Sequence, residues 1–273
     1  MTAVWGWTFV LVKDAIAQYP TLPFLAIRFA LALLVMLVIV RRLPGRRTLL
    51  VGGAVGAVVA AGYLLQTVGL QSTSAGNAGL ITGLFVVFTP LLERLTGRRV
   101  PWFTYPAVAM ALLGTVLLAG GGALQIGLGE LLLLGCALAF AIQIVLLSHW
   151  SPGQPAGPLA LVQMGTVALV FAIPAAPSLH RPGPSVWFAL VITGVFASAL
   201  AMFIQTWAQQ RLSASRTAVI LATEPAWALF FSVLLTGQRL GPVQAAGAFL
   251  MLAAIFGYEG GARWAERKIG TSP

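Results

Sequence analysis

The sequence contains Leu95-Thr96-Gly97-Arg98-Arg99 and, about 140 residues later, the closely related Leu235-Thr236-Gly237-Gln238-Arg239. In nearly the same register, Gln66-Thr67 recurs as Gln205-Thr206. This repetition indicates a chain built from two related halves. We expect five hydrophobic spans in each half, and an odd number makes the second half enter the bilayer upside down. Inverted repeats around a site at the membrane midplane are typical of secondary transporters.

The composition also indicates a membrane protein. Of the 273 residues, 59% are hydrophobic and only 8% are charged. A soluble domain could not cover so apolar a surface with polar groups. One span needs about 20 apolar residues, so ten spans would use about 200 residues and leave only short connections. We therefore expect no separate soluble domain.

The sequence predicts an all-α polytopic membrane protein of ten transmembrane helices in two inverted five-helix repeats. The expected spans are 1–18, 21–40, 49–70, 74–94, 101–120, 127–148, 157–177, 185–209, 214–236 and 241–260. The first repeat is expected over 1–120, the second over 127–262, and a cytoplasmic tail over 263–273. Two clusters of turn-forming residues support the boundaries, one at 41–47 around Pro44-Gly45 and one at 151–155.

Positive charge predicts the orientation in the membrane, because Lys and Arg gather on the cytoplasmic side. With a cytoplasmic N-terminus, twelve basic residues fall inside and three outside. The twelve are Arg41, Arg42, Arg46, Arg47, Arg94, Arg98, Arg99, Arg211, Arg216, Arg263, Arg267 and Lys268, and the three are Lys13, Arg181 and Arg239. We therefore expect a multi-pass protein of the plasma (inner) membrane with both termini cytoplasmic. Basic residues in cytoplasmic loops then account for the net charge of +10, so nucleic acid is not an expected partner.

Pairs of glycines four residues apart indicate close helix packing. Gly52 with Gly56, and Gly79 with Gly83, form small-xxx-small patterns that let helix backbones approach one another in lipid. We assign these glycines to packing and to no further function.

Two ionisable residues lie well within expected spans, Arg28 and Glu224. Such residues are costly in hydrocarbon, at roughly 2.5 to 3.5 kcal/mol each, and each needs a partner or a role. Glu224, followed by Pro225, is the candidate for proton coupling and for substrate contact; the alternative is a structural carboxyl that binds backbone groups freed by the proline. Arg28 is suited to a carboxylate or phosphate of the substrate. Its alternative role is an ion pair with Glu224 or a bond to a helix end.

Other polar and aromatic residues within the spans are candidates for the substrate pathway, since small-molecule sites combine apolar walls with a few polar anchors. Gln66 and Gln205 occupy equivalent places in the repeats and fit gates at opposite mouths; the alternative is hydrogen bonding within each helical hairpin. The remaining candidates are Trp5, Tyr63, Asn77, Thr82, Gln143 and Trp207.

The same residues carry a family resemblance. The run from Ala78 to Leu92 resembles the fourth span of EamA-type members of the drug/metabolite transporter superfamily. Gln205-Thr206-Trp207-Ala208-Gln209 and Glu224-Pro225 resemble spans eight and nine, and Trp5-Gly6 and Arg28-Phe29 also fit. The resemblance implies ten helices and a central cavity that exports small metabolites such as amino acids, amines or drugs. One departure is that Arg98 and Gln238 replace a Glu that many members carry after spans four and nine.

The leading interpretation is a secondary transporter that works by alternating access, with a small-molecule substrate and the lipid bilayer as its partners. Protons are the candidate coupling ion, and the sequence leaves open whether they drive transport or the protein merely equilibrates its substrate. An alternative is a polytopic membrane enzyme acting on lipid, but such enzymes need clustered His, Asp, Glu or Cys, and this chain has one Asp, one Cys and two His. Another alternative is a passive facilitator or channel, and no filter loop is visible. We expect no catalytic residue, no metal site and no cofactor, and predict no oligomeric state.

Overall fold

The computed structural model describes residues 1–73, 75–118, 127–224, 227 and 241–270. All regular structure within these residues is helical, so the all-α prediction is confirmed. The helices are α1 (Thr2–Gln18), α2 (Thr21–Ile39), α3 (Arg46–Ser72), α4 (Ala75–Thr82), α5 (Phe85–Leu95), α6 (Thr104–Leu118), α7 (Leu128–Trp150), α8 (Ala156–Ala175), η1 (Ala176–Ser178), α9 (Pro184–Val191), η2 (Ile192–Leu200), α10 (Ala201–Gln209), α11 (Ala214–Leu221) and α13 (Pro242–Gly270).

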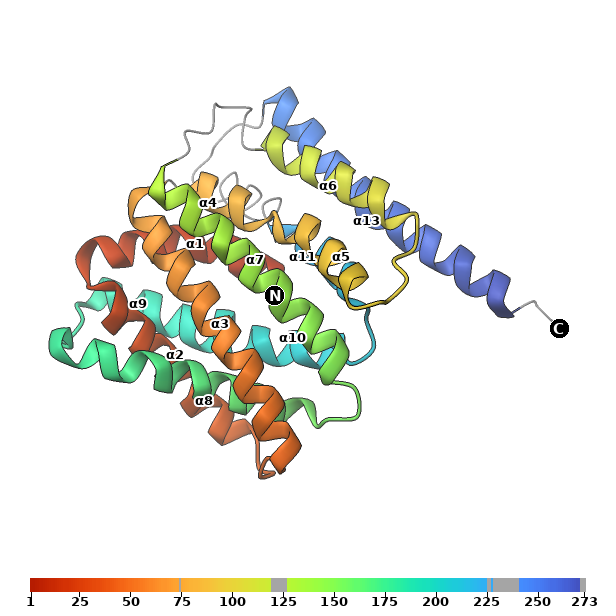
Figure 1. Cartoon of the computed structure of the whole chain (residues 1–273). Coiled ribbons are helices and arrows are strands. Elements are labelled where there is room, and N and C mark those ends of the chain that lie inside the picture. Colours follow the sequence, from red (N-terminus) through yellow and green to blue (C-terminus); the bar gives the residue numbers. More distant parts are fainter. Residues whose placement is uncertain (74, 119–126, 225–226, 228–240, 271–273) are drawn as a thin grey trace.

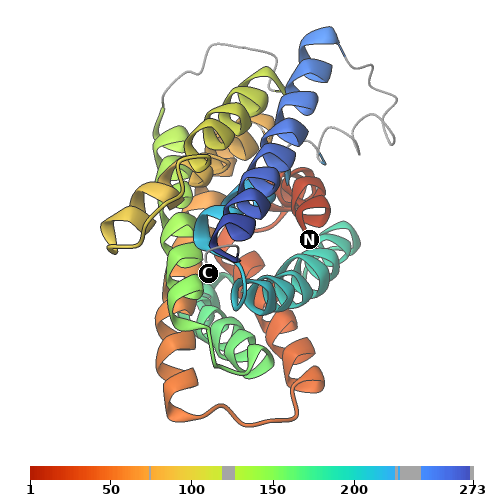
Figure 2. The ribbon, with the colours of Figure 1, turned by 90° about the vertical axis from the view of Figure 1, so that its right-hand side faces the viewer.

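The long helices form one packed bundle with a helix pair along one edge. Helix α3 packs against both α7 and α8, and α2 packs against α8 and η2. Helices α6 and α13 lie side by side, and α5 and α11 connect this pair to the bundle (Figure 1). The C-terminal part of α13 extends beyond the other helices in Figure 1, and in Figure 2 its end lies in front of the bundle.

Six helical segments of the described chain are long and apolar enough to cross a membrane. They are Thr21–Ile39, Arg46–Ser72, Leu128–Trp150, Ala156–Ser178, Pro184–Gln209 and Pro242–Ala265, and Thr104–Gly114 is a shorter apolar helix. These segments establish a multi-pass membrane protein. The count of ten spans and the inverted relation of the two halves remain predictions, because about half of the expected span 214–236, namely 225–226 and 228–236, lies outside the described residues.

The expected span 74–94 is wrong as a single helix, since it consists of α4 and α5 with a break at Gly83-Leu84. At the break the backbone tightens: the Leu84 amide donates to the Ile81 carbonyl at 3.1 Å, a spacing of three residues instead of four. Gly83 is a poor helix former, which favours a break here, whereas Pro90 lies inside α5 and removes the amide donor for the Val86 carbonyl.

The last helix also differs from its prediction. Helix α13 continues to Gly270, beyond the expected span 241–260, so most of the segment 263–273 is helical, and its cytoplasmic location stays a prediction.

Close contacts fix α3 against α8. A Cβ built on Gly52 would lie 2.7 Å from Val162, and one on Gly56 would lie 2.7 Å from Thr166. The packing role predicted for these two glycines is therefore confirmed at the contact of α3 with α8. At Gly79 a Cβ would meet Phe9 at an ordinary 3.8 Å, so that glycine marks no close approach.

A lysine of α1 caps the C-terminal end of α3. Lys13 Nζ donates to the carbonyls of Leu70 at 2.6 Å, Gln71 at 3.1 Å and Thr73 at 2.9 Å. Carbonyls at a helix C-terminus lack intrahelical partners, and a cation also complements the helix dipole there. Lys13 therefore caps α3 from α1, and both helices contribute side chains to the cavity described below.

Candidate functional site

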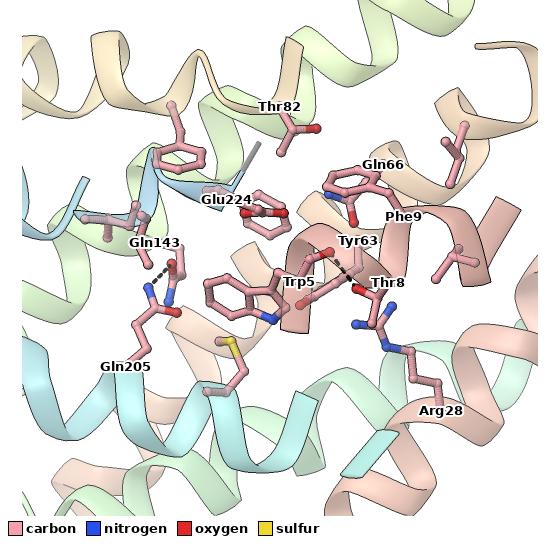
Figure 3. Close-up of a pocket in the computed structure, with 17 residues that line it drawn as sticks. Trp5, Thr8, Phe9, Arg28, Tyr63, Gln66, Thr82, Gln143, Gln205 and Glu224 are labelled. Carbon is pink, nitrogen blue, oxygen red and sulfur yellow. Dashed lines mark hydrogen bonds between the residues drawn. The ribbon is translucent and has the colours of Figure 1, made fainter. Parts of the chain in front are cut away.

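A cavity lies among α1, α2, α3, α7, α10, the facing ends of α4 and α5, and the end of α11. It offers about 60 Å³ of space for the centres of water molecules, and one water needs about 10–15 Å³ by this measure. Its lining consists of Trp5, Thr8, Phe9, Val12, Arg28, Tyr63, Gln66, Leu70, Thr82, Phe85, Phe140, Gln143, Ile144, Met202, Gln205, Leu221 and Glu224 (Figure 3). The wall is mostly apolar and aromatic with a few convergent polar groups, as in most small-molecule sites.

The cavity brings together eight of the ten residues that the sequence suggested for a substrate pathway. They are Trp5, Arg28, Tyr63, Gln66, Thr82, Gln143, Gln205 and Glu224. Trp207 does not line the cavity: it is 53% exposed, and the Arg211 guanidinium lies over its ring at 5.4 Å. Two positions along a helix turn a side chain by about 200°, so Gln205 and Trp207 face opposite sides of α10. Asn77 belongs to α4, but its side chain lies outside the described residues.

Arg28 contacts Ser198 of η2, Tyr63 of α3 and its neighbour Phe29 on α2. Its Nε donates to Ser198 Oγ at 2.9 Å, and its guanidinium lies 4.6 Å from the Tyr63 ring centre and 5.3 Å from that of Phe29. Aromatic faces attract a guanidinium, so these rings offset part of the cost of burying a residue that is only 3% exposed. In Figure 3 the Arg28 side chain extends from α2 toward the labelled residues of the cavity.

Glu224 lies just after α11 and contributes a carboxyl group to the same cavity. It forms no ion pair with Arg28: within the described residues the salt bridge is between Arg216 and Glu259. The ion-pair alternative considered for Arg28 is therefore absent from this structure. The cavity instead presents one cationic and one acidic side chain, neither of which neutralises the other by direct contact.

Buried glutamines form a hydrogen-bonded network on the α7–α10 side of the cavity. Gln205 donates from Nε2 to Gln143 Oε1 at 3.2 Å and to Gln209 Oε1 at 2.9 Å. Gln209 in turn donates to the Ile144 carbonyl at 2.8 Å and to Ser148 Oγ at 2.9 Å. Gln143 Nε2 is buried and has no hydrogen-bond partner among the described residues. A buried donor without a partner costs free energy, so this amide is available to a water or a ligand in the cavity.

Two helix interruptions reach the cavity wall. Thr82 and Phe85 flank the break between α4 and α5, and both line the cavity. Leu221 ends α11, and Glu224 follows after a turn in which the Thr223 amide donates to the Ile220 carbonyl. Backbone that is not fully helical is tolerated at membrane depth where it is buried in protein or lines a cavity.

Sequence reasoning missed several lining residues. Thr8 and Phe9 lie one turn after Trp5 on α1, and their helical spacing from Trp5 could have identified them. Phe85 and Met202 carry no such signal, since apolar residues in an apolar span are indistinguishable without the packing. Within the described part of the chain, no group of three or more His, Cys, Asp or Glu could hold a metal ion.

Comparisons with known proteins agree with the suggested resemblance and confirm it. The model of a family described as the EamA-like transporter family matches residues 1–120 and 127–258. An uncharacterized transporter of Archaeoglobus fulgidus is 34% identical over 255 residues, which cover 92% of this chain and 81% of that protein. The uncharacterized inner membrane transporter YedA of Escherichia coli K12 is 24% identical over 251 residues, covering 88% of this chain and 82% of YedA.

The fold also occurs in a solved structure. A protein crystal structure that is 19% identical in sequence superposes with a TM-score of 0.78, covering 97% of this chain and 96% of the other. At this identity the similarity establishes the fold alone.

Proposed function

The chain belongs to the EamA-like transporter family, and from this premise we propose that it is a secondary transporter. It moves a small molecule through the central cavity by alternating access, the two halves of the chain moving relative to one another about the site. The proposed direction is export, and the proposed substrates are small metabolites such as amino acids, amines or drugs.

One observation carries this proposal: both helix interruptions lie at the cavity and at matching places in the two sequence repeats. The register that aligns Leu95 with Leu235 aligns Gly83 with Thr223 and Leu84 with Glu224. Paired interruptions in corresponding spans of two repeats are a general indication of a transporter's binding site. They support the assignment of the cavity, rather than a surface groove, as the place where substrate binds.

The proposal includes the architecture inferred from the sequence. Ten helices form two inverted five-helix repeats, over 1–120 and 127–262, in the plasma membrane with both termini cytoplasmic. The excess of basic residues in loops on one side supports this orientation.

The polar groups of the cavity have complementary proposed roles. Arg28 binds an anionic group of the substrate, because its guanidinium offers paired donors on the cavity side. Glu224 carries the coupling proton and faces cationic groups, as ionisable residues within membrane spans often serve ion or proton pathways. Gln66 and the Gln143–Gln205 pair provide neutral hydrogen-bonding groups along the substrate's path.

Uptake into proteoliposomes tests the proposal. Labelled L-leucine, L-glutamate and tetraphenylphosphonium would be offered to the wild type and Glu224→Gln, with and without a pH gradient. We expect the gradient to drive accumulation of a probe in the wild type and not in Glu224→Gln. Asp14→Asn is the matched control, because Asp14 is an exposed carboxyl outside the cavity.

The other outcomes are equally informative. Equilibration of a probe by both proteins regardless of pH would identify a facilitator and would contradict proton coupling through Glu224. Absence of transport of all three probes by the wild type, in vesicles where protein insertion is verified, would contradict the proposed substrate classes.

A further inference from the structure

The helix that follows α9 contains a π-helical segment, η2, which faces α1 and α2. It runs from Ile192 to Leu200 within an otherwise continuous helix, Pro184–Gln209. π-helical turns are rare, cost stability and are frequently found at functional sites. Because no proline lies within this segment, its winding calls for another explanation.

The hydrogen bonds at the end of η2 provide an explanation for the π-helical winding. The Ala201 amide, which in an α-helix would bond the Ala197 carbonyl, instead donates to the carbonyls of Phe196 and Ser198. The Ala197 carbonyl is thereby left for another donor, and Trp5 Nε1 of α1 donates to it at 2.6 Å. The π-helical winding therefore creates an acceptor in mid-helix that holds the Trp5 indole against the cavity wall.

The next residue of η2 holds the second cavity residue. Ser198 is fully buried, and its hydroxyl accepts the hydrogen bond from Arg28 Nε at 2.9 Å. The backbones also approach closely here, since a Cβ on Gly194 would lie 2.9 Å from the Arg28 carbonyl oxygen. Two consecutive residues of η2 thus bind one cavity residue from α1 and one from α2.

The bond to Ser198 determines which edge of the guanidinium remains available. A guanidinium can bind a carboxylate side-on through Nε and one Nη, or end-on through both Nη groups. In this structure Nε is already bonded to Ser198. We propose that Ser198 is a positioning residue that fixes Arg28 with its two Nη groups toward the cavity, as an end-on subsite for a carboxylate of the substrate. This inference rests on the proposed transport function, which it extends to a residue that does not itself line the cavity.

The first test examines the geometry without transport. Arginine Nε–H signals would be recorded by ¹H–¹⁵N NMR in nanodiscs, and the Arg28 signal assigned by its loss in Arg28→Lys. We expect Ser198→Ala to shift this signal and to accelerate its exchange with water. Thr193→Val is the matched control: Thr193 is a buried hydroxyl residue of the same segment that donates to the Ala189 carbonyl of its own helix. An unchanged Arg28 signal in Ser198→Ala would overturn the inference.

The second test examines specificity in proteoliposomes. For Ser198→Ala we expect the KM for L-leucine to rise about tenfold, the range for loss of a hydrogen bond to a charged group, with little change in maximal rate. Transport of tetraphenylphosphonium, which has no carboxylate, should change little, and Thr193→Val should resemble the wild type for both probes. Equal losses for both probes would overturn the specificity role.

The two proposals fail in distinguishable ways. If the wild type carries neither probe, the proposed substrate classes fail, while the NMR signal still decides whether Ser198 positions Arg28.

Discussion

The carboxylate of Glu93 accepts hydrogen bonds from both the backbone amide and the hydroxyl of Ser215, a residue 122 positions further along the chain. Glu93 lies near the end of α5, and Ser215 lies in the first turn of α11. The first amides of a helix have no intrahelical acceptor, so Glu93 satisfies one of them from the other half of the chain. This contact fixes the start of α11, the helix that leads to Glu224.

Glu93→Gln should destabilise the protein, because both Ser215 donors bind the same carboxylate oxygen, and the neutral amide oxygen that takes its place accepts hydrogen bonds more weakly. The residue is 4% exposed, so water cannot replace the weakened bonds. We expect a loss of about 1 to 3 kcal/mol in unfolding free energy, the usual cost of a missing partner for a buried group. Thermal unfolding in detergent, followed by tryptophan fluorescence, measures it.

The matched control is Glu259→Gln, which removes the same charge from a more exposed position. Glu259 pairs with Arg216, and their side chains are 22% and 31% exposed. Ion pairs of this kind contribute about 0 to 1 kcal/mol. A larger loss for Glu259→Gln than for Glu93→Gln would contradict the assignment of Glu93 as the principal contact at the start of α11.

Gly56→Ala should weaken the packing of α3 on α8. The added Cβ would lie 2.7 Å from Thr166 Cβ and 2.9 Å from the Gln163 carbonyl oxygen, so the backbones must separate. Overpacking of this kind costs about 1 to 3 kcal/mol, which the same unfolding measurement detects. Gly53→Ala, with no atom within 4 Å of the new Cβ, should leave stability unchanged or slightly raise it.

The course of the helices was largely predictable from local signals. The turn-forming clusters expected at 41–47 and 151–155 coincide closely with the gaps between α2 and α3 and between α7 and α8. Hydrophobic length, charge and Pro-Gly signals act within a few residues, so they can be read without a structure.

The non-α-helical details were not predictable, because they depend on partners far along the chain. The π-helical segment η2 accepts a hydrogen bond from Trp5 at Ala197, 192 positions away, and no residue within η2 predicts its π-helical winding. The candidate site was also only partly predictable. The larger polar residues in apolar spans were identified from the sequence, but Ser198 was not, because serine is common at helix contacts in membranes.

Lys13→Met should loosen the junction of α1 and α3 while keeping the apolar stem of the side chain. Three carbonyls at the end of α3 would lose their donor, and two of the three hydrogen bonds, those to Leu70 and Thr73, are partly buried. We expect faster hydrogen exchange of the backbone over residues 67–72, measured by mass spectrometry. Asp14→Asn, a change at the neighbouring exposed position, should leave exchange in this segment as in the wild type; equal acceleration by both would contradict the cap.

Gln66→Cys, made together with Cys136→Ala, should react with a charged, water-soluble methanethiosulfonate reagent. Gln66 lines the cavity, and a cysteine there can ionise to the reactive thiolate where water reaches it. Leu64→Cys is the matched control on the same helix: Leu64 is 37% exposed but does not line the cavity, so its thiol faces lipid, where thiolates do not form. A transported probe at saturating concentration should slow the labelling of Gln66→Cys. Equal labelling of the two cysteines, unaffected by probe, would mean that the cavity is not the aqueous pathway. This result would also contradict the roles proposed for Arg28 and Glu224.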